Sequence, residues 1–419
     1  MSNLSYMQKT TDRGQLRIHV TTERGFFPIK DASIRLSYTG NPTEIIEELS
    51  TDISGQTAAV ELPAPPLEYS MEPSEFQPYS EYTIQVNASG YRPINISGIS
   101  VLPDKTSIQN VRMETATVEN PPERNIVITA NTLYGNFPPK IPEDEIKPMN
   151  ESGEIVLSRV VIPEYVVVHD GPPSDTRAKN YYVKYRDYIK NVASSEIYST
   201  WPEATIRANI LAIQSFTLNR VYTEWYRNKG KDFTITSSTA YDHKFVPGRN
   251  IFESISAIVD EIFSEYLSRP NVEQPILTQY CDGKNVSCPN WLSQWGSKAL
   301  GDQGYTAIEI LRNYYGDSIY INSTDEISGI PSSYPGSPLR VGDSGEKVRQ
   351  MQRQLNVISN AYPLIPKIAE DGVFGPATEE AVKTFQRIFG LTQDGIVGFR
   401  TWYKISEIYV GVSRIAELV

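Results

Sequence analysis

The sequence predicts a multidomain protein with an amino-terminal all-β sandwich, a central α+β domain and a carboxyl-terminal three-helix domain. The chain has 419 residues, which is too many for one hydrophobic core. Short strand-like runs separated by turn residues fill the region 1–113, whereas helical periodicity dominates from about residue 176. A proline-rich stretch over 114–175 separates the two patterns, so we expect it to be a linker.

The region 1–113 has the pattern of a small antiparallel β-sandwich. Apolar and polar residues alternate over 16–20, 33–37 and 82–86, and Gly, Pro, Asn and Asp residues separate these runs. The segment from Ala88 to Val101 resembles the closing strands of transthyretin-like and carboxypeptidase-regulatory domains. We find no acidic pair or metal-binding group in this region and assign it no chemistry.

The stretch 114–175 is acidic and contains three Pro-Pro pairs, at 121–122, 138–139 and 172–173. Such a stretch cannot build a core of its own, so it is expected to run extended over a surface or between domains. An accessible, extended chain is also what a protease requires. We therefore predict a cleavage between about Glu114 and Val160, in the earlier half of that interval.

Two predicted helices meet at Glu196 in the central region 176–330. The run 200–203 (TWPE) combines the spacing of a capping box with a proline suited to a first helical turn. Apolar side chains then recur at three- and four-residue steps to about Asn228, as on the buried face of a helix. Glu196 is therefore expected between this long helix and a shorter one that ends near Ser195.

Glu196 is the leading candidate for a catalytic residue. A carboxyl group held at this junction against Tyr198, Trp201 and aliphatic neighbours would be partly desolvated. Desolvation raises the pKa of a carboxyl group and lets it donate a proton near neutral pH. The alternative is a solvated glutamate at a helix end, which is the commoner situation when the residues alone are considered.

Two sequence blocks resemble the active-site segments of the SpoIID/LytB family of peptidoglycan lytic transglycosylases. The first runs from Ala193 to Arg220 and the second from Thr278 to Asp317. The resemblance implies a catalytic domain over 176–330 in which Glu196 is both acid and base. Glu196 would protonate the oxygen between N-acetylmuramic acid and N-acetylglucosamine, and would then deprotonate the muramic C6 hydroxyl, which closes an anhydro ring. Ordinary glycosidases use two carboxyl groups instead.

The same resemblance implies a set of substrate-binding residues, namely Tyr241, Asp242, Tyr280, Ser293 and Gln294. A glutamine side chain can both donate to and accept from sugar groups, so we favour Gln294 as a residue of the groove. Capping of the following helix is the alternative for Ser293. Asp242 would either orient the sugar or hold a structural turn.

Cys281 and Cys288 admit more than one interpretation. Some SpoIID members bind zinc near this position through cysteine and histidine, and zinc needs four such ligands. The only histidines of this chain, His19, His169 and His243, lie neither between nor beside the cysteines. We therefore expect no metal and no other cofactor. A short-loop disulfide or two free thiols remain, and the disulfide is favoured outside a reducing cytosol.

The region 338–419 resembles the three-helix peptidoglycan-binding module of wall hydrolases. The resemblance rests on the motifs 339–345, 371–376 and 394–402. Apolar residues recur at helical spacing before and after the second motif, and the Asp-Gly pairs supply the positive φ that turns between helices need.

The composition is that of globular domains and argues against some partners. Hydrophobic residues make up 39% and charged residues 21%, and the net charge is −11. This acidic balance, without any basic run, argues against nucleic acid as a partner. The amino terminus lacks an apolar signal segment, and no stretch has the length needed to span a bilayer.

The order of the three parts resembles that of the SleC family of clostridial spore cortex-lytic enzymes. This resemblance implies a zymogen whose region 1–113 is a propeptide and which a subtilisin-like protease activates. It implies a spore protein of the cortex and coat region, made in the mother cell without a signal peptide, that acts on cortex peptidoglycan. Two alternatives remain. One is another peptidoglycan hydrolase such as an amidase, and the other is a non-catalytic wall-binding protein.

Overall fold

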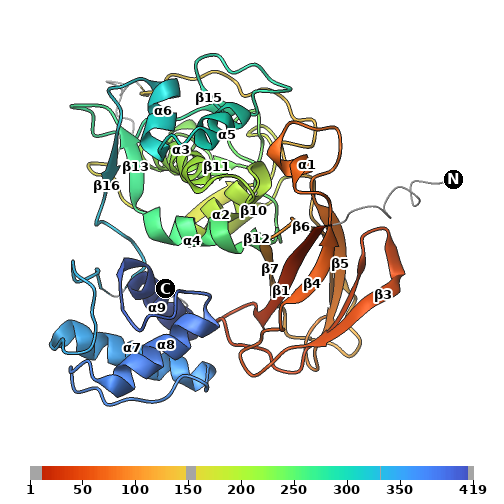
Figure 1. Cartoon of the computed structure of the whole chain (residues 1–419), viewed down its shortest axis with the longest axis vertical. Coiled ribbons are helices and arrows are strands. Elements are labelled where there is room, and N and C mark those ends of the chain that lie inside the picture. Colours follow the sequence, from red (N-terminus) through yellow and green to blue (C-terminus); the bar gives the residue numbers. More distant parts are fainter. Residues whose placement is uncertain (1–11, 148–156, 331, 414–419) are drawn as a thin grey trace.

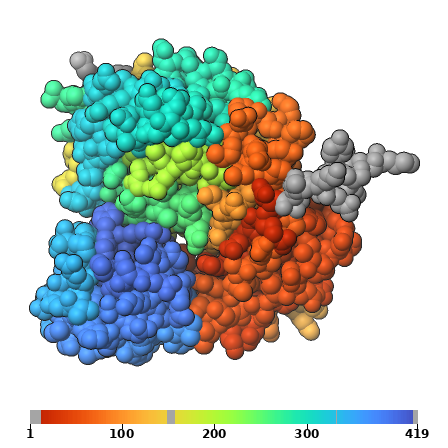
Figure 2. All heavy atoms as spheres, viewed as in Figure 1, coloured from red at the N-terminus to blue at the C-terminus, as the bar shows by residue number. Residues whose placement is uncertain are grey.

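The structure is a computed structural model that describes residues 12–147, 157–330 and 332–413. A β-rich amino-terminal part, a mixed central part and a helical carboxyl-terminal part contact one another (Figures 1 and 2). The amino-terminal and carboxyl-terminal parts are joined by hydrogen bonds from Gln56 Nε2 to the carbonyl of Ile388 (2.6 Å) and from the Tyr362 hydroxyl to the carbonyl of Phe26 (2.8 Å).

The amino-terminal part consists, in the described residues, of two sheets around a common core. The strand orders are β12-β7-β1-β4, in which β12 is Ile251–Phe252 of the central part, and β3-β2-β5-β6-β8. Leu16, Ile18 and Val20 of β1 lie in one buried cluster with Ile84 and Val86 of β5, as alternation along strands requires. The strands are β1 (Asp12–Thr22), β2 (Ser33–Tyr38), β3 (Asn41–Ser50), β4 (Val60–Ala64), β5 (Ser80–Asn87), β6 (Ile94–Val101), β7 (Thr106–Met113) and β8 (Arg124–Val127), and a short helix α1 (Glu68–Met71) follows β4.

The proline-rich stretch 114–175 contributes strands to both of its neighbours. Its beginning supplies β8, which pairs in parallel with β6. Its end supplies β9 (Tyr165–His169), the middle strand of a sheet whose outer strands are β10 (Asn180–Lys184) and β11 (Ile235–Thr236). Residues 131–147, which we call the strap, run without regular secondary structure over the central part. The predicted linker therefore completes the sheets of its neighbours, because a segment without a core still has to pair its backbone groups.

The central part is organised around α3 (Glu203–Tyr222). It packs against α2 (Tyr185–Glu196), α4 (Glu253–Ile262), α5 (Gln294–Asp302) and α6 (Ala307–Tyr315). A helix surrounded in this way has to pair its polar side chains internally, and the amide nitrogens of Asn209, Gln214 and Asn219 donate to acceptors on neighbouring segments. The remaining elements are β10 (Asn180–Lys184), η1 (Arg227–Lys229), β11 (Ile235–Thr236), β12 (Ile251–Phe252), β13 (Glu265–Ser268), β14 (Tyr280–Cys281), β15 (Leu292–Ser293) and β16 (Tyr320–Ser323).

The start and the end of α3 differ from the sequence prediction. The capping box at its start is absent, because the Thr200 hydroxyl donates to Ser70 Oγ of α1 at 2.8 Å. Pro202 is the N-cap residue rather than a residue of the first turn, and the helix ends at Tyr222. The prediction failed because Thr200 finds a partner 130 residues away, which local spacing does not reveal.

The amino-terminal and central parts share a sheet. Strand β12 pairs with β7, so that residues 251–252 extend the amino-terminal sheet. Next to this pair, Asn250 exchanges two hydrogen bonds with the backbone of Ser100, at 2.9 and 3.0 Å. The two parts are therefore joined by backbone pairing as well as by the covalent chain that connects them.

The carboxyl-terminal part contains α7 (Glu346–Ala361), α8 (Pro376–Ile388) and α9 (Phe399–Ser413). The same glutamine arrangement occurs twice. Gln352 accepts from the amide of Gly372 at 2.8 Å, and Gln386 accepts from the amide of Gly395 at 2.9 Å. Each glutamine amide thereby fixes an Asp-Gly turn whose glycine has positive φ, 75° and 74° respectively.

Candidate active site

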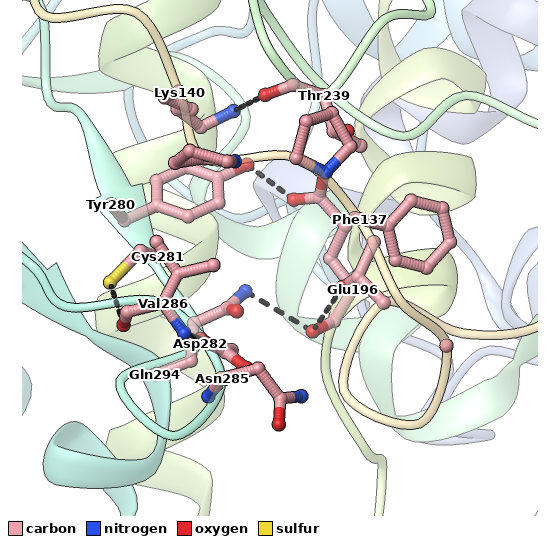
Figure 3. Close-up of a pocket in the computed structure, with 14 residues that line it drawn as sticks. Phe137, Lys140, Glu196, Thr239, Tyr280, Cys281, Asp282, Asn285, Val286 and Gln294 are labelled. Carbon is pink, nitrogen blue, oxygen red and sulfur yellow. Dashed lines mark hydrogen bonds between the residues drawn. The ribbon is translucent and has the colours of Figure 1, made fainter.

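Glu196, the last residue of α2, is among the residues that line a small pocket (Figure 3). The strap contributes Thr132, Gly135, Phe137, Pro138, Pro139 and Lys140 to the lining, and the central part contributes the rest. The pocket has a volume of about 60 Å³, whereas ordinary ligand pockets have roughly 300–1,000 Å³. With the strap in place, the pocket has room for water molecules but not for a sugar chain.

The strap is held on the central part by backbone and side-chain contacts. Ile141 donates its amide to the carbonyl of Ala240 at 2.7 Å, and the carbonyl of Glu145 accepts from the amide of Leu277 at 2.8 Å. The Glu145 carboxylate also accepts two hydrogen bonds from Arg269, at 2.7 and 2.8 Å. The strap is therefore a bound segment of the structure rather than a free connection.

Both carboxylate oxygens of Glu196 accept a hydrogen bond. The amide of Lys244 donates to Oε1 at 2.6 Å, and the hydroxyl of Tyr280 donates to Oε2. The residue is only 2% exposed. Burial raises the pKa of Glu196, while the charge of Lys140 and the two hydrogen bonds act in the opposite direction without cancelling the rise. Glu196 is thus a buried carboxyl group that holds its proton to higher pH than usual.

The raised pKa makes the stability contributed by Glu196 depend on pH. Below its ordinary pKa of 4.5 the contribution is full, and it is lost as the pH rises through the pKa in the folded protein. The free energy of unfolding of the native chain should therefore fall relative to that of Glu196→Gln as the pH is raised from 4.5 towards neutrality. Denaturant titrations of both proteins measure this difference, and a difference that is independent of pH would contradict the assignment.

Lys140 of the strap brings a cation into the site. Its Nζ donates to the carbonyl of Asp242 and, at 3.4 Å, to that of Thr239, and it lies 4.8 Å from the ring centroid of Tyr280. Burial lowers the pKa of Lys140, whereas the charges of Glu196 and Asp242 raise it. Sequence reasoning missed Lys140 because no local pattern marks it, and its contacts join segments about a hundred residues apart.

Asp242 is fully buried and connects neighbouring elements. Its carboxylate accepts from Arg220 Nε (2.8 Å), from the Tyr226 hydroxyl (2.7 Å) and from the amide of Thr236 (2.9 Å). These contacts fit the second role considered for Asp242 from the sequence, that of a structural residue that holds a turn. Tyr241 is partly exposed and lines a separate cavity beside the strap.

Tyr280 and Gln294 are brought next to Glu196, and Ser293 is not. Gln294 Nε2 donates to the backbone carbonyl of Glu196 at 3.1 Å, so it supports the end of α2 while lining the pocket. Ser293 is the N-cap of α5, where its hydroxyl accepts from the amide of Gly296 at 2.9 Å. Ser293 therefore has the capping role that the sequence left open.

Cys281 and Cys288 form a disulfide with Cα atoms 5.7 Å apart. The two sulfur atoms are bonded to each other and are not zinc ligands in this state. Among the described residues, no group of three or more His, Cys, Asp or Glu side chains could hold a metal ion. His243 instead places its ring beside Tyr280, with Nδ1 at 2.9 Å from the hydroxyl of Tyr188.

A second carboxylate, that of Asp282, also lines the pocket. Its oxygens accept from the amides of Asn285 and Val286, both at 2.9 Å, and so hold the turn within the disulfide loop. Of these two carboxyl groups, Glu196 is the buried one, and Asp282 is committed to the backbone of its own loop. The pocket therefore offers one carboxyl group suited to proton transfer.

Comparison with known proteins identifies the carboxyl-terminal part. Residues 344–405 match the family model described as "Putative peptidoglycan binding domain". The helical region of α7, α8 and α9 thus matches a peptidoglycan-binding domain, which supports peptidoglycan as a partner. In the three described ranges of the chain, no helix is both long enough and apolar enough to cross a membrane.

Curated relatives share parts of the sequence. A "Zinc D-Ala-D-Ala carboxypeptidase" of Streptomyces albus G is 38% identical over 89 residues, which cover 21% of this chain and 33% of the relative. An "Autolytic lysozyme" of Clostridium acetobutylicum is 27% identical over 202 residues, 44% of this chain and 58% of the relative. The chain spans about one third to three fifths of the length of the curated relatives it matches.

A solved structure also matches part of the chain. It is the amino-terminal domain of SleB, which is 32% identical, with 18% of this chain and 97% of that chain covered and a TM-score of 0.16.

Proposed function

We propose that this protein is a peptidoglycan lytic transglycosylase that is made in an inactive form. The observation that carries the proposal is the buried carboxyl group of Glu196, whose pKa is raised and which lies in a pocket without a second available carboxylate. The match of residues 344–405 to a peptidoglycan-binding domain indicates peptidoglycan as the polymer on which this group would act.

The mechanism needs one carboxyl group in two successive roles. Protonated Glu196 donates its proton to the glycosidic oxygen as the bond from muramic C1 breaks. The resulting carboxylate accepts the proton of the muramic C6 hydroxyl, whose oxygen attacks C1 and closes the anhydro ring. The Tyr280 hydroxyl and the Lys244 amide hold the two carboxylate oxygens in place during both steps. No water is consumed, so a second carboxylate to activate water is not required.

The strap is the inhibitory element in this proposal. Its residues wall the pocket of about 60 Å³ at Glu196, and the charge of Lys140 acts on the carboxyl group that has to exchange a proton. A subtilisin-like protease would activate the enzyme by cutting the chain near the strap. In keeping with the sequence resemblance, we place the protein in the spore, made in the mother cell, with cortex peptidoglycan as its substrate during germination.

The closed pocket favours one alternative, a non-catalytic wall-binding protein. In that case the carboxyl-terminal part would bind peptidoglycan and the central part would serve as a scaffold. An amidase, the other alternative, usually needs zinc, and the disulfide of Cys281 and Cys288 removes the two thiols nearest the pocket.

The test is the chemistry of the fragments that the protein, cut beside its strap, releases from cortex peptidoglycan. Mass spectrometry should find anhydro-muramic ends. Reducing muramic ends or freed peptides would indicate another hydrolase instead. Wall binding without any soluble fragment would support the scaffold alternative.

A further inference from the structure

The strap places the carboxylate of Glu143 against the fully buried guanidinium of Arg220. Glu143 accepts from Arg220 Nη1 at 3.0 Å and from Nη2 at 2.5 Å, which is the two-pronged geometry that arginine forms with carboxylates. The Arg220 side chain is 0% exposed. Arg220 belongs to α3 of the central part, whereas Glu143 belongs to the strap.

Arg220 needs an acceptor whether or not the strap is present. Its Nε is bound to Asp242, which holds the guanidinium in place from the other side. Loss of Glu143 would leave Nη1 without the acceptor that the described residues give it. An unpaired buried donor costs about 1–3 kcal/mol, and more when it is charged. An activated enzyme is therefore stabilised when another anion takes the place of Glu143.

The surroundings of Arg220 suit a sugar that carries an acid group. A cavity of about 640 Å³ lies beside Glu143, and its walls on the central part include Trp225, Tyr241, Lys229 and Lys231. Aromatic faces pack against apolar faces of ligands, and lysine side chains attract anions. The hydrogen bonds around Arg220 also connect it to Glu196, the proposed acid. Arg220 binds Asp242, and Lys140 donates to the carbonyl of Asp242 and lies close enough to Glu196 to affect its pKa.

We propose that Arg220 is a carboxylate-binding residue of the substrate groove, and that Glu143 occupies its place until the strap leaves. The ligand is a carboxylate of the glycan strand, carried either by the peptide stem or by the lactyl group of muramic acid. This proposal rests on the proposed function for its ligand, but binding does not require catalysis.

The experiment measures binding of peptidoglycan disaccharides to the full chain by calorimetry. A disaccharide of N-acetylglucosamine and N-acetylmuramic acid lacks the bond that the proposed reaction breaks, so binding and cleavage are separated. The probes are the disaccharide tetrapeptide, the same molecule with its peptide carboxylates amidated, and the disaccharide without peptide, whose lactyl carboxylate is free. Glu143→Ala is compared with native protein, because the short side chain opens the acceptor position of Arg220 to the neighbouring cavity while the strap stays in place. Glu145→Ala is the matched control because Glu145 pairs with Arg269 in the same strap.

Glu143→Ala should bind a carboxylate-bearing probe at least about tenfold more tightly than native protein, since the competing carboxylate is gone and its place is open. A gain with the tetrapeptide alone assigns the site to the peptide stem, and a gain with the peptide-free disaccharide assigns it to the lactyl group. The gain should vanish in Glu143→Ala/Arg220→Lys, because lysine cannot form the two-pronged contact. Equal gains for the amidated probe, an equal effect of Glu145→Ala, or no gain with any probe would overturn the proposal. Absence of bond cleavage in the separate activity test would overturn the proposed function and leave this result standing.

Discussion

Replacing Glu196 by glutamine is expected to abolish the release of anhydro-muramic ends from peptidoglycan by the activated protein. Glutamine has nearly the same size and can still accept from Tyr280 or Lys244, but its amide cannot donate the proton that the leaving oxygen needs. General acid–base catalysis by one residue contributes about 10²–10⁴-fold, so a loss of at least that size is expected. The rate of soluble fragment release measures it.

Glu203→Gln is the matched control for this substitution. Glu203 lies at the start of α3, where it pairs with Arg207 and its side chain is 74% exposed. Fragment release by this variant should equal that of native protein, and both variants should still bind peptidoglycan through the carboxyl-terminal part. Retention of activity by Glu196→Gln would remove Glu196 from the mechanism.

A cut on the carboxyl-terminal side of the strap is expected to activate the protein, and a cut on its amino-terminal side is not. When the chain is cut between Lys147 and β9, the strap is joined covalently only to the amino-terminal part and can leave with it. A cut between β7 and β8 leaves β8 and the strap joined to the central part. The strap then remains at an effective concentration in about the millimolar range. Activity should therefore differ at least about tenfold between the two cut proteins.

The two cuts can be made by inserting the same protease site at 117–120 or within 148–156. Residues 117–120 are exposed, and 148–156 lie outside the described residues. After either cut, dilution or mild denaturant is used to separate β7 from β12, and size-exclusion chromatography checks that the amino-terminal fragment has left before activity is measured. Equal activities of uncut and cut proteins would contradict an inhibitory strap. The sequence favoured a scissile bond in the earlier half of 114–160, whereas the contacts of the strap favour the later side.

Local patterns in the sequence predicted the helix ends around Glu196 but not what covers it. The end of α2 at Glu196 and the apolar periodicity of α3 follow from neighbouring residues. The burial of Glu196 depends on Tyr280 and Lys140, which come from segments 84 and 56 positions away. Only the family resemblance pointed to Tyr280, and nothing pointed to Lys140.

The failures of the sequence prediction share one physical cause. Thr200 has capping-box spacing yet bonds Ser70, and the proline-rich stretch supplies strands to two sheets. In both cases a partner distant in the sequence competes with the local arrangement. The Asp-Gly turns of the carboxyl-terminal part were predictable because the positive φ of Gly372 and Gly395 is a local property that glycine adopts without strain.

The most direct test of the account compares four proteins, native and Glu196→Gln, each uncut and cut after the strap. Mass spectrometry counts the anhydro-muramic ends that each releases from cortex peptidoglycan. The account predicts such ends from the cut native protein and none above background from the other three. Anhydro-muramic ends from cut Glu196→Gln, or equal amounts from cut and uncut native protein, would contradict it.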